Sequence, residues 1–378
     1  MNKSLKIGIM TLSSSDNCGS CLQAYALLQV LEKYGKAEII NFVSKKSHIY
    51  YDLPQMGIKK RIECFFDHTK HDKYKKARLC KKKYEEFRSN HLRMDITKEI
   101  DSELLHSINE KYDVFVVGSD QVWNVLMGDF DEAFFLGWTD KKKIAYAPSL
   151  GGVDIRSGLH PDKYIEQIRR FNYISVRENT GKKCLDEICK EPVEKVLDPT
   201  LLLEIKDWRK LVGEPLVEGE YIFYYSWAYR NENLMEIVRG EGKRIGCPVI
   251  VIDSRKWINR DEGKYDFILS NNEGPISFLN LMYYAHRVFV ESFHGVIFSY
   301  IFGKNFWLLD SHDTFDDVDS RLKEIVLLLN VKDRVLFEND YSVAKIEEPI
   351  KYESNSKLYN LKNESFRYLR KAFYGGEE

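Results

Sequence analysis

The chain has 378 residues, which is long enough for two domains of ordinary size. Apolar residues make up 44% of it, so the composition is that of a globular protein rather than a disordered one. A formal net charge of −1 gives no case for nucleic acid, and no stretch approaches the roughly 20 apolar residues of a membrane span. Because the N-terminus runs into an amphipathic strand instead of a signal-peptide core, we expect a cytoplasmic protein.

The first half of the sequence alternates apolar runs with amphipathic segments. Residues 5–12 are predicted as a strand and residues 13–20 as a polar loop. A helix follows, with apolar side chains at helical spacing and Gly35 as its expected C-cap. Further strands are expected at 38–43, 114–117, 143–147, 173–176 and 193–197. This alternation predicts a parallel sheet covered by helices, that is, an α/β fold.

A second α/β domain is predicted beyond residues 207–220, where glycine and proline interrupt the pattern. Its strands are expected at 221–225, 248–252, 267–269, 287–290 and 306–309. We therefore expect an N-terminal domain over residues 1–208, with a basic helical insertion at about 55–110, and a C-terminal domain over residues 216–345. The charged helical tail, residues 346–378, is expected to pack back on the first domain.

The basic insertion carries the most uneven charge in the chain. From Lys59 to Arg93 there are 13 Lys or Arg residues against 5 Asp or Glu, with Lys81, Lys82 and Lys83 at the densest point. One interpretation is a solvated helical surface. The other is a surface that meets anionic lipid headgroups or a lipid-diphosphate-linked acceptor.

The seven cysteines are odd in number and irregularly spaced, which favours reduced thiols over a disulfide framework. Cys18 and Cys21 form a lone CxxC without a second pair at zinc spacing. They are interpreted as small loop residues, and no metal is expected.

The most informative motif is Glu291-Ser292-Phe293-His294-Gly295, between two apolar runs. An apolar run, a polar turn with glycine and a longer apolar segment predict strand, turn and helix. Ligands of open α/β sheets bind at the carboxyl ends of strands, and helix N-termini favour anions. His294 could therefore move protons beside a phosphate or carboxylate, whereas a capping or core histidine is the alternative.

Three other loops carry polar groups after a predicted strand. Residues 13–20 could cradle an anion or a sugar hydroxyl with their N–H groups. In the next loop Asp120 could accept a proton from a sugar hydroxyl and Trp123 could pack on the ring; a helix cap with a buried Trp is the alternative. Arg177 could hold a carboxylate or phosphate bidentately, or pair structurally with Glu178.

Together these loops resemble the polysaccharide pyruvyltransferase family, over about residues 6–334. The resemblance is carried, in this order, by Asn17-Cys18-Gly19 with Gln23-Ala24-Tyr25, Gly118-Ser119-Asp120-Gln121-Val122-Trp123-Asn124, Tyr146-Ala147-Pro148-Ser149, Ile174-Ser175-Val176-Arg177-Glu178, Leu197-Asp198-Pro199-Thr200 and Ser292-Phe293-His294-Gly295. The resemblance implies two Rossmann-like domains facing a cleft, as in GT-B glycosyltransferases. It also implies transfer of pyruvate from phosphoenolpyruvate onto two sugar hydroxyls as a cyclic ketal, in making capsules, exopolysaccharides or cell-wall polymers.

The resemblance also suggests roles for individual residues. His294 and Asp120 are expected to be catalytic. Residues expected to bind phosphoenolpyruvate are Arg177, Arg321, Ser292, Gly295 and Lys304; residues expected to bind the acceptor are Asn17, Gly19, Gln23, Ser119, Gln121, Trp123 and Asn124. Other branches of the family carry an Arg where this chain has Phe293 and a Lys where it has Thr314, so Arg321 or Lys304 is expected to supply the missing charge. No cofactor is expected beyond the donor substrate.

Two other functions fit the same sequence less well. A glycosyltransferase that uses a nucleotide sugar would share the two-domain fold, since fold does not fix chemistry. A non-catalytic carbohydrate-binding protein would not require polar groups in so many loops. The basic segment favours a lipid-diphosphate-linked acceptor and peripheral contact with the inner face of the membrane.

Overall fold

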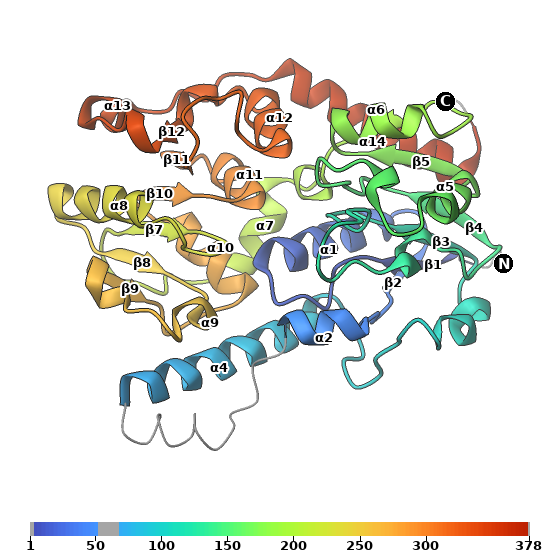
Figure 1. Cartoon of the computed structure of the whole chain (residues 1–378), viewed down its shortest axis with the longest axis horizontal. Coiled ribbons are helices and arrows are strands. Elements are labelled where there is room, and N and C mark those ends of the chain that lie inside the picture. Colours follow the sequence, from blue (N-terminus) through green and yellow to red (C-terminus); the bar gives the residue numbers. More distant parts are fainter. Residues whose placement is uncertain (1–3, 52–67, 377–378) are drawn as a thin grey trace. The chain divides into compact units, whose positions relative to one another are not determined.

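The computed structural model describes residues 4–51 and 68–376, and it divides into two compact units (Figure 1). Unit 1 takes in the described residues within Met1–Asp52, Glu85–Leu203 and Ser356–Glu378. Unit 2 takes in those within Leu53–Tyr84 and Glu204–Asn355. Each unit is built on one six-stranded sheet whose paired strands all run parallel.

The sheet of unit 1 has the strand order β2-β1-β3-β4-β5-β6. Its strands are β1 (Lys6–Met10), β2 (Lys36–Ile39), β3 (Val114–Val117), β4 (Lys142–Ala145), β5 (Tyr173–Val176) and β6 (Glu194–Lys195). All four residues of β3 are buried, as are the last four of β1. Strands covered on both faces read as continuous apolar runs, which explains why the sequence pattern located them.

Helices cover the sheet of unit 1. They are α1 (Cys18–Leu31), α2 (Lys45–Tyr51), the C-terminal part of α4 (His68–His91), α5 (Pro161–Arg169), α6 (Asn179–Asp186) and α14 (Ser356–Tyr374), with 3₁₀ turns η1 (Leu105–Lys111), η2 (Glu132–Phe135), η3 (Ile155–Ser157) and η4 (Pro199–Leu201). The C-terminal helix α14 forms hydrogen bonds with the sheet of unit 1 and with the loop after β6. The Tyr368 hydroxyl donates to the Ala145 carbonyl at the end of β4 at 2.8 Å, and Ser365 Oγ accepts from the Leu197 amide at 2.9 Å.

The sheet of unit 2 has the order β12-β11-β10-β7-β8-β9. Its strands are β7 (Ile222–Tyr225), β8 (Val249–Val251), β9 (Phe267–Leu269), β10 (Arg287–Val290), β11 (Phe306–Asp310) and β12 (Val335–Phe337). The first strand in the chain, β7, thus lies between β8 and β10, so the strand order reverses there. In doubly wound sheets this reversal is where the ligand crevice forms, beyond the carboxyl ends of the strands.

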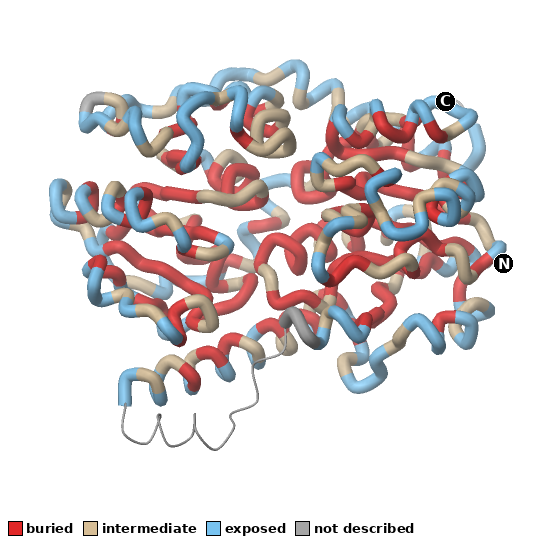
Figure 2. The backbone as a smooth tube through the Cα atoms, viewed as in Figure 1, coloured by how far each residue is buried: buried red, intermediate tan, exposed pale blue. Residues whose placement is uncertain are grey.

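The helices of unit 2 alternate with its strands, and Figure 2 shows buried backbone running through the interior of each unit. They are the N-terminal part of α4, then α7 (Ile205–Val212), α8 (Glu232–Ile245), α9 (Ser254–Trp257), α10 (Pro275–Tyr284), α11 (Phe293–Ile301), α12 (Ser320–Leu328) and α13 (Val343–Glu347), with 3₁₀ turns η5 (Glu262–Tyr265), η6 (Lys332–Arg334) and η7 (Glu338–Asp340). Within residues 4–51 and 68–376, no helix is both long and apolar enough to cross a membrane.

The predicted fold class is confirmed, and the differences lie at the ends of elements. Helix α1 stops at Leu31, short of the predicted cap at Gly35, and β2 starts at Lys36. The last strand, β12, was not predicted. The division between the units falls after Leu203 and not within the glycine-rich stretch, because α7 packs on α10 of unit 2.

The basic insertion was expected to belong to the first domain, but its described residues up to Tyr84 belong to unit 2. Apolar packing gives the reason, since Tyr74 and Ala77 of α4 form a small cluster with Ile258. Charge adds to it: Lys73 Nζ lies 2.6 Å from a Glu262 carboxylate oxygen. Residues 59–67 of the basic segment lie outside the described residues.

Helix α4 also brings a thiol to a buried carboxyl of unit 2. Glu273 is 5% exposed and accepts hydrogen bonds from the Ser254 amide and hydroxyl at 3.0–3.1 Å. Burial raises the pKa of Glu273 to about 7, although hydrogen bonds from Cys80 and Ser254 oppose the shift. The pKa of the buried Cys80 thiol is raised as well, by burial first and then by Glu273.

Protonated Glu273 is therefore expected to stabilise the docking of α4. A carboxyl whose pKa is higher in the folded than in the unfolded protein loses stabilising free energy as pH rises. Between the ordinary value of 4.5 and about 7, we expect the unfolding free energy of the wild type to fall by up to about 3 kcal/mol relative to Glu273→Gln. Urea unfolding of both proteins from pH 4.5 to 8 measures this difference, and parallel pH profiles would contradict it.

Candidate active site

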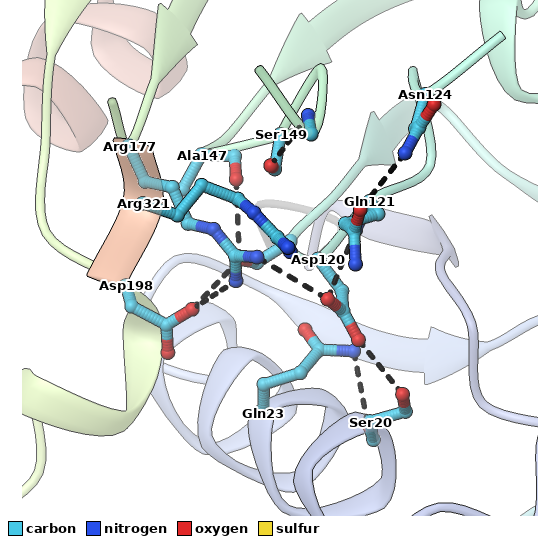
Figure 3. Close-up of polar contacts among 12 residues, drawn as sticks. Ser20, Gln23, Asp120, Gln121, Asn124, Ala147, Ser149, Arg177, Asp198 and Arg321 are labelled. Atoms are coloured by element: carbon cyan, nitrogen blue, oxygen red, sulfur yellow. Dashed lines mark hydrogen bonds and ion pairs between the residues drawn. The ribbon is translucent and has the colours of Figure 1, made fainter. Parts of the chain in front are cut away.

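Parallel strands send their carboxyl ends to one edge of a sheet, and in unit 1 the polar loops gather there. The loops after β1, β3, β4, β5 and β6 hold Thr11, Asp120, Ser149, Arg177 and Asp198 respectively. All five residues are buried, with exposed fractions of 0–8% for the whole residue. Figure 3 shows several of these side chains turned toward one another.

Asp120 is the centre of the polar contacts in unit 1. Its carboxylate accepts from Ser20 Oγ at 2.7 Å and from the Gln121 amide at 3.0 Å, and it lies 3.3 Å from an Arg177 nitrogen. Its backbone φ of 67° lies in the left-handed region, where a non-glycine residue carries strain. The Asp120 carboxylate is thus held in one orientation by donors from α1 and from the loop after β5.

Arg177 lies among carboxylates and is not presented to solvent. Its side chain is 2% exposed, and its nitrogens lie 2.7 Å from Asp198, 3.3 Å from Asp120 and 3.7 Å from Glu178. Burial lowers the pKa of Arg177, but the three carboxylates outweigh that effect and leave the pKa raised. One guanidinium among three carboxylates leaves a formal charge of −2 on the group.

The other two carboxylates are anchored by neutral donors. Asp198 accepts from Ser119 Oγ at 3.2 Å and from the Thr200 amide and hydroxyl at 3.0 and 2.6 Å. Glu178 accepts from Ser149 Oγ at 2.8 Å and from the Leu150 amide at 2.7 Å. Each acid therefore joins two loops of the carboxyl edge, and the loops form one connected network.

Several predicted acceptor residues belong to this network or to its supports. Gln23 is fully buried and donates to Thr11 Oγ1 at 2.8 Å, whereas Ser119 is fully buried against the Ala147 carbonyl. Asn17 caps α1 by accepting from the Ser20 amide, and Gly19 is buried in the first turn of α1. The structure places Cys18 and Cys21 in this helix as buried residues and not in a loop.

Trp123 was expected to stack on a sugar, and the structure places it in the core instead. Its indole is 0% exposed, packs edge-on against Phe171 at 5.4 Å, and donates from Nε1 to the Phe134 carbonyl at 3.1 Å. A buried indole with its N–H satisfied offers no face to a ligand. Gln121 and Asn124 are partly buried and bonded to each other at 2.9 Å, so they can still reach a ligand.

In unit 2, His294 lies in the first turn of α11, directly beyond β10. Ser292 caps the helix by accepting from the Gly295 amide at 3.0 Å. A side chain at position 295 would place its Cβ 2.7 Å from Ser292 Oγ and 2.8 Å from Val290 Cβ, so only glycine fits there. His294 is 9% exposed and meets the Phe293 ring edge-on at 5.3 Å.

Two acidic groups beside His294 were not predicted. Glu291 accepts a hydrogen bond from the buried Tyr224 hydroxyl, and burial raises its pKa, with Asp310 adding to the shift. On the neighbouring strand, Asp310 Oδ1 lies 2.6 Å from Nδ1 of the half-exposed His312. The sequence signal for both was the same as for His294, namely polar residues that directly follow an apolar strand.

The two cations expected to complete the donor site lie at opposite edges of the sheet. Arg321, in the first turn of α12, follows β11 and belongs to the same carboxyl edge as His294; it pairs with Asp319 at 2.9 Å. Lys304 precedes β11 and so lies at the amino edge, where its Nζ donates to the Tyr283 carbonyl at 2.9 Å. Helix α11 separates Lys304 from His294, so the two side chains lie at opposite ends of that helix.

Within residues 4–51 and 68–376, no group of three or more His, Cys, Asp and Glu side chains is placed to hold a metal ion. The three carboxylates of unit 1 surround a guanidinium.

Solved structures share the fold of the whole chain. A putative UDP-N-acetylglucosamine 2-epimerase from Listeria monocytogenes matches with a TM-score of 0.53 and 12% identity, covering 100% of this chain and 98% of its own. The UDP-GlcNAc 2-epimerase from Neisseria meningitidis bound to UDP-GlcNAc gives a TM-score of 0.53 at 12% identity, covering 98% and 100%. The enzyme from Rickettsia bellii gives 0.52 at 9% identity, covering 98% of both chains. At such identities the likeness shows the fold alone, which is of the GT-B type.

The family is shown by sequence. No match is found among the curated proteins. A family model described as "Polysaccharide pyruvyl transferase" matches residues 17–313, which include the loops of Asp120, Arg177 and His294. Since this match covers well over half of the chain, the protein belongs to the polysaccharide pyruvyl transferase family.

Proposed function

We propose that the protein moves the pyruvyl group of phosphoenolpyruvate onto two hydroxyls of a sugar as a cyclic ketal, in the biosynthesis of a capsule, an exopolysaccharide or another cell-surface glycan. The observation that carries the proposal is the family match over residues 17–313, with His294 at the N-terminus of α11 beyond the strand-order reversal of unit 2. A histidine at the N-terminus of a helix suits an anionic donor that must gain a proton, because the helix dipole favours the anion and the imidazole can supply the proton.

The reaction needs two proton movements. The methylene carbon of phosphoenolpyruvate gains a proton and becomes a methyl group, which leaves a cationic centre at C2. One sugar hydroxyl attacks C2 and loses its proton; a second hydroxyl then displaces phosphate and closes the ketal. Of the two hydroxyl protons, one ends in the methyl group and the other on phosphate. A group that donates at one step and accepts at another suits both movements, and we assign this role to His294.

The charge of the donor is met in unit 2 by three proposed contacts. The first turn of α11, capped by Ser292 and closely packed at Gly295, begins just beyond β10, and the dipole of the helix favours an anion at this end. Arg321 lies at the same edge, and although it pairs with Asp319, a guanidinium has five N–H donors. Glu291, whose pKa burial raises, is a second candidate for carrying a proton in this loop.

Asp120 is proposed to orient or deprotonate the acceptor hydroxyl. Because Ser20 and Arg177 hold its carboxylate, it can act from one fixed position. The contacts of Arg177 favour a positioning role over direct donor binding, since its guanidinium is 2% exposed and meets Asp198 at 2.7 Å. Gln121 and Asn124 are proposed to contact the acceptor directly, and Asn17, Gly19, Gln23 and Ser119 to support the loops.

A lipid-diphosphate-linked intermediate at the inner membrane face is the acceptor that the basic segment favours. Lys82 and Lys83 of α4 are exposed, and Lys81 is partly buried. Lysines near a membrane surface gain roughly 1 kcal/mol each from anionic lipid.

The reaction class is tested by incubating the protein with phosphoenolpyruvate and a panel of acceptors that includes galactose, mannose, glucose and N-acetylhexosamine glycosides. Mass spectrometry should find the added mass of a pyruvate ketal on at least one acceptor, with release of inorganic phosphate that depends on that acceptor. Release of a nucleoside diphosphate from a nucleotide sugar, without use of phosphoenolpyruvate, would instead indicate a glycosyltransferase.

His294→Gln is expected to lower the turnover number by roughly 10²- to 10⁴-fold, because proton transfer by a placed side chain contributes that much. The matched control is His286→Gln at the other end of the same strand, where a half-exposed imidazole pairs with Glu220. Phosphate release kinetics on an accepted sugar measure both. Near-normal turnover by His294→Gln would remove His294 from the mechanism.

Arg177→Ala is expected to lower the unfolding free energy by about 3–5 kcal/mol, because it leaves buried carboxylates without their counter-charge. The control is Arg156→Ala, whose side chain is 51% exposed and pairs with Asp154 and Glu187, and which should leave the unfolding free energy nearly unchanged. Urea unfolding measures both variants. A stable Arg177→Ala protein with a raised KM for phosphoenolpyruvate would show that Arg177 binds the donor directly.

A further inference from the structure

One tryptophan of unit 2 differs from the others in being open to solvent. Trp227 is 38% exposed, whereas Trp208, Trp257 and Trp307 of the same unit are at most 1% exposed. Single exposed apolar side chains are common on protein surfaces, so exposure by itself indicates nothing. The position and the surroundings of Trp227 carry the argument.

The loop that bears Trp227 is fixed in place. Ser226 Oγ accepts from the Ala228 and Tyr229 amides at 3.2 and 2.9 Å, and Arg260 donates to the Ala228 carbonyl at 2.9 Å. The Tyr229 ring is fully buried and packs against Trp257 at 4.9 Å. An exposed indole on a rigid turn can bind a ligand without first losing conformational freedom.

This loop leaves the sheet beside the loop of His294. Strand β7 pairs with β10 in register Tyr225 to Val290, and the Glu291 amide donates to the Tyr225 carbonyl at 3.0 Å. Trp227 therefore lies just beyond β7 at the reversal of strand order, where doubly wound sheets bind ligands.

One cation lies over the indole, and further cations lie near that cation. Lys256 Nζ lies 4.2 Å from the centroid of the Trp227 ring, and the exposed Arg230 follows in the same loop. Burial lowers the pKa of Lys256, Asp253 raises it, and Arg255, Arg230 and Arg260 lower it further, so positive charge converges there. Arg255 is paired with Asp253 at 2.9 Å, which leaves Lys256 and Arg230 as the cations best suited to a ligand.

An aromatic face beside clustered cations fits a ligand with a ring and a strong negative charge. Sugar rings pack their C–H faces on indoles, and lysine and arginine bind phosphate groups. We propose that Trp227, Lys256 and Arg230 form a subsite for a sugar that carries a diphosphate, with the ring on the exposed part of the indole and the diphosphate at the two cations.

The subsite deepens the proposed function and rests on it, since it makes the acceptor of pyruvyl transfer a glycosyl diphosphate and not a finished neutral polymer. A lipid-linked and a nucleotide-linked sugar share this chemistry. Because binding can be measured without turnover, the subsite and the reaction can fail separately.

The test uses tryptophan fluorescence of the full chain. The probes are UDP-N-acetylglucosamine, N-acetylglucosamine linked to farnesyl diphosphate, and methyl N-acetylglucosaminide. At least one of the two diphosphates should change the emission of the wild type and bind at least tenfold more tightly than the glycoside. Trp227→Phe should abolish the signal change, whereas Trp138→Phe in unit 1 should keep it. Which diphosphate binds more tightly identifies the source of the sugar.

Variants then assign the contacts by isothermal titration. Trp227→Ala and Lys256→Ala should each weaken binding of the diphosphate sugar roughly tenfold, with Trp227→Phe restoring part of the loss. The control is Lys264→Ala, whose ammonium lies over the Tyr265 ring at 5.0 Å and pairs with Glu232, and which should bind normally. In pyruvyl transfer, Trp227→Ala should raise the acceptor KM and leave the phosphoenolpyruvate KM unchanged.

Several outcomes would overturn the subsite. One is equal affinity of the wild type, Trp227→Ala and Lys256→Ala for both diphosphate sugars. Another is binding of UDP as tightly as UDP-N-acetylglucosamine, since the sugar would then contribute nothing to affinity. Binding with these effects but no pyruvyl transfer to any acceptor would refute the proposed reaction and support the subsite. Pyruvyl transfer with an unchanged acceptor KM in Trp227→Ala would support the proposed reaction and refute the subsite.

Discussion

Parallel pairing of all the strands is the constraint on which both units depend. In a parallel sheet each strand must be reached by a crossover, so every carboxyl end meets the same edge. That rule brings Asp120, Arg177 and Asp198 together from three loops far apart in the sequence. In unit 2 the same rule places Trp227, His294 and Asp310 on one edge and sends Lys304 to the other. The residues that follow a strand thus determine the chemistry of the edge, whereas the residues within a strand determine how the core packs.

The buried charges of unit 1 show how such an edge is kept rigid. The three carboxylates around Arg177 also accept hydrogen bonds from neutral donors, which are Ser20, Ser119, Ser149 and Thr200. An isolated buried charge would cost far more than its contacts return, but a connected network spreads the field over several loops. The network also restricts the conformations of its side chains: Asp120 keeps one orientation, and Arg177 is buried. Arg177, which the sequence motif suggested as a ligand of phosphoenolpyruvate, therefore lies among the acids of unit 1.

The sequence predicted the features that depend on local residue patterns, and it missed those that depend on tertiary packing. Apolar runs buried on both faces, such as Val114–Val117, identified the strands, and the Ser292 cap with Gly295 identified the start of α11. The short strand Val335–Phe337 lacked a long apolar run and was missed. Trp123 looked like a ligand platform because a polar loop carries it; only packing against Phe171 shows that it is core. The position of Lys304 depends on the sheet topology, and the environment of Arg177 depends on which acids the fold brings beside it; a single sequence contains neither.

The two edges differ in a way that bears on their proposed roles. In unit 1 the acids and Arg177 satisfy one another below the surface, which suits a group that must hold a hydroxyl in one place. In unit 2 the carboxyl edge keeps Trp227 38% exposed, the His312 side chain 52% exposed and Arg230 exposed. Exposed side chains such as Arg230 and Trp227 can bind an anionic, ring-bearing ligand at little cost of reorganisation, because an exposed side chain need not leave a buried network first. We therefore propose that the edge of unit 2 recognises charged substrate and that the edge of unit 1 holds the acceptor hydroxyl in a fixed orientation.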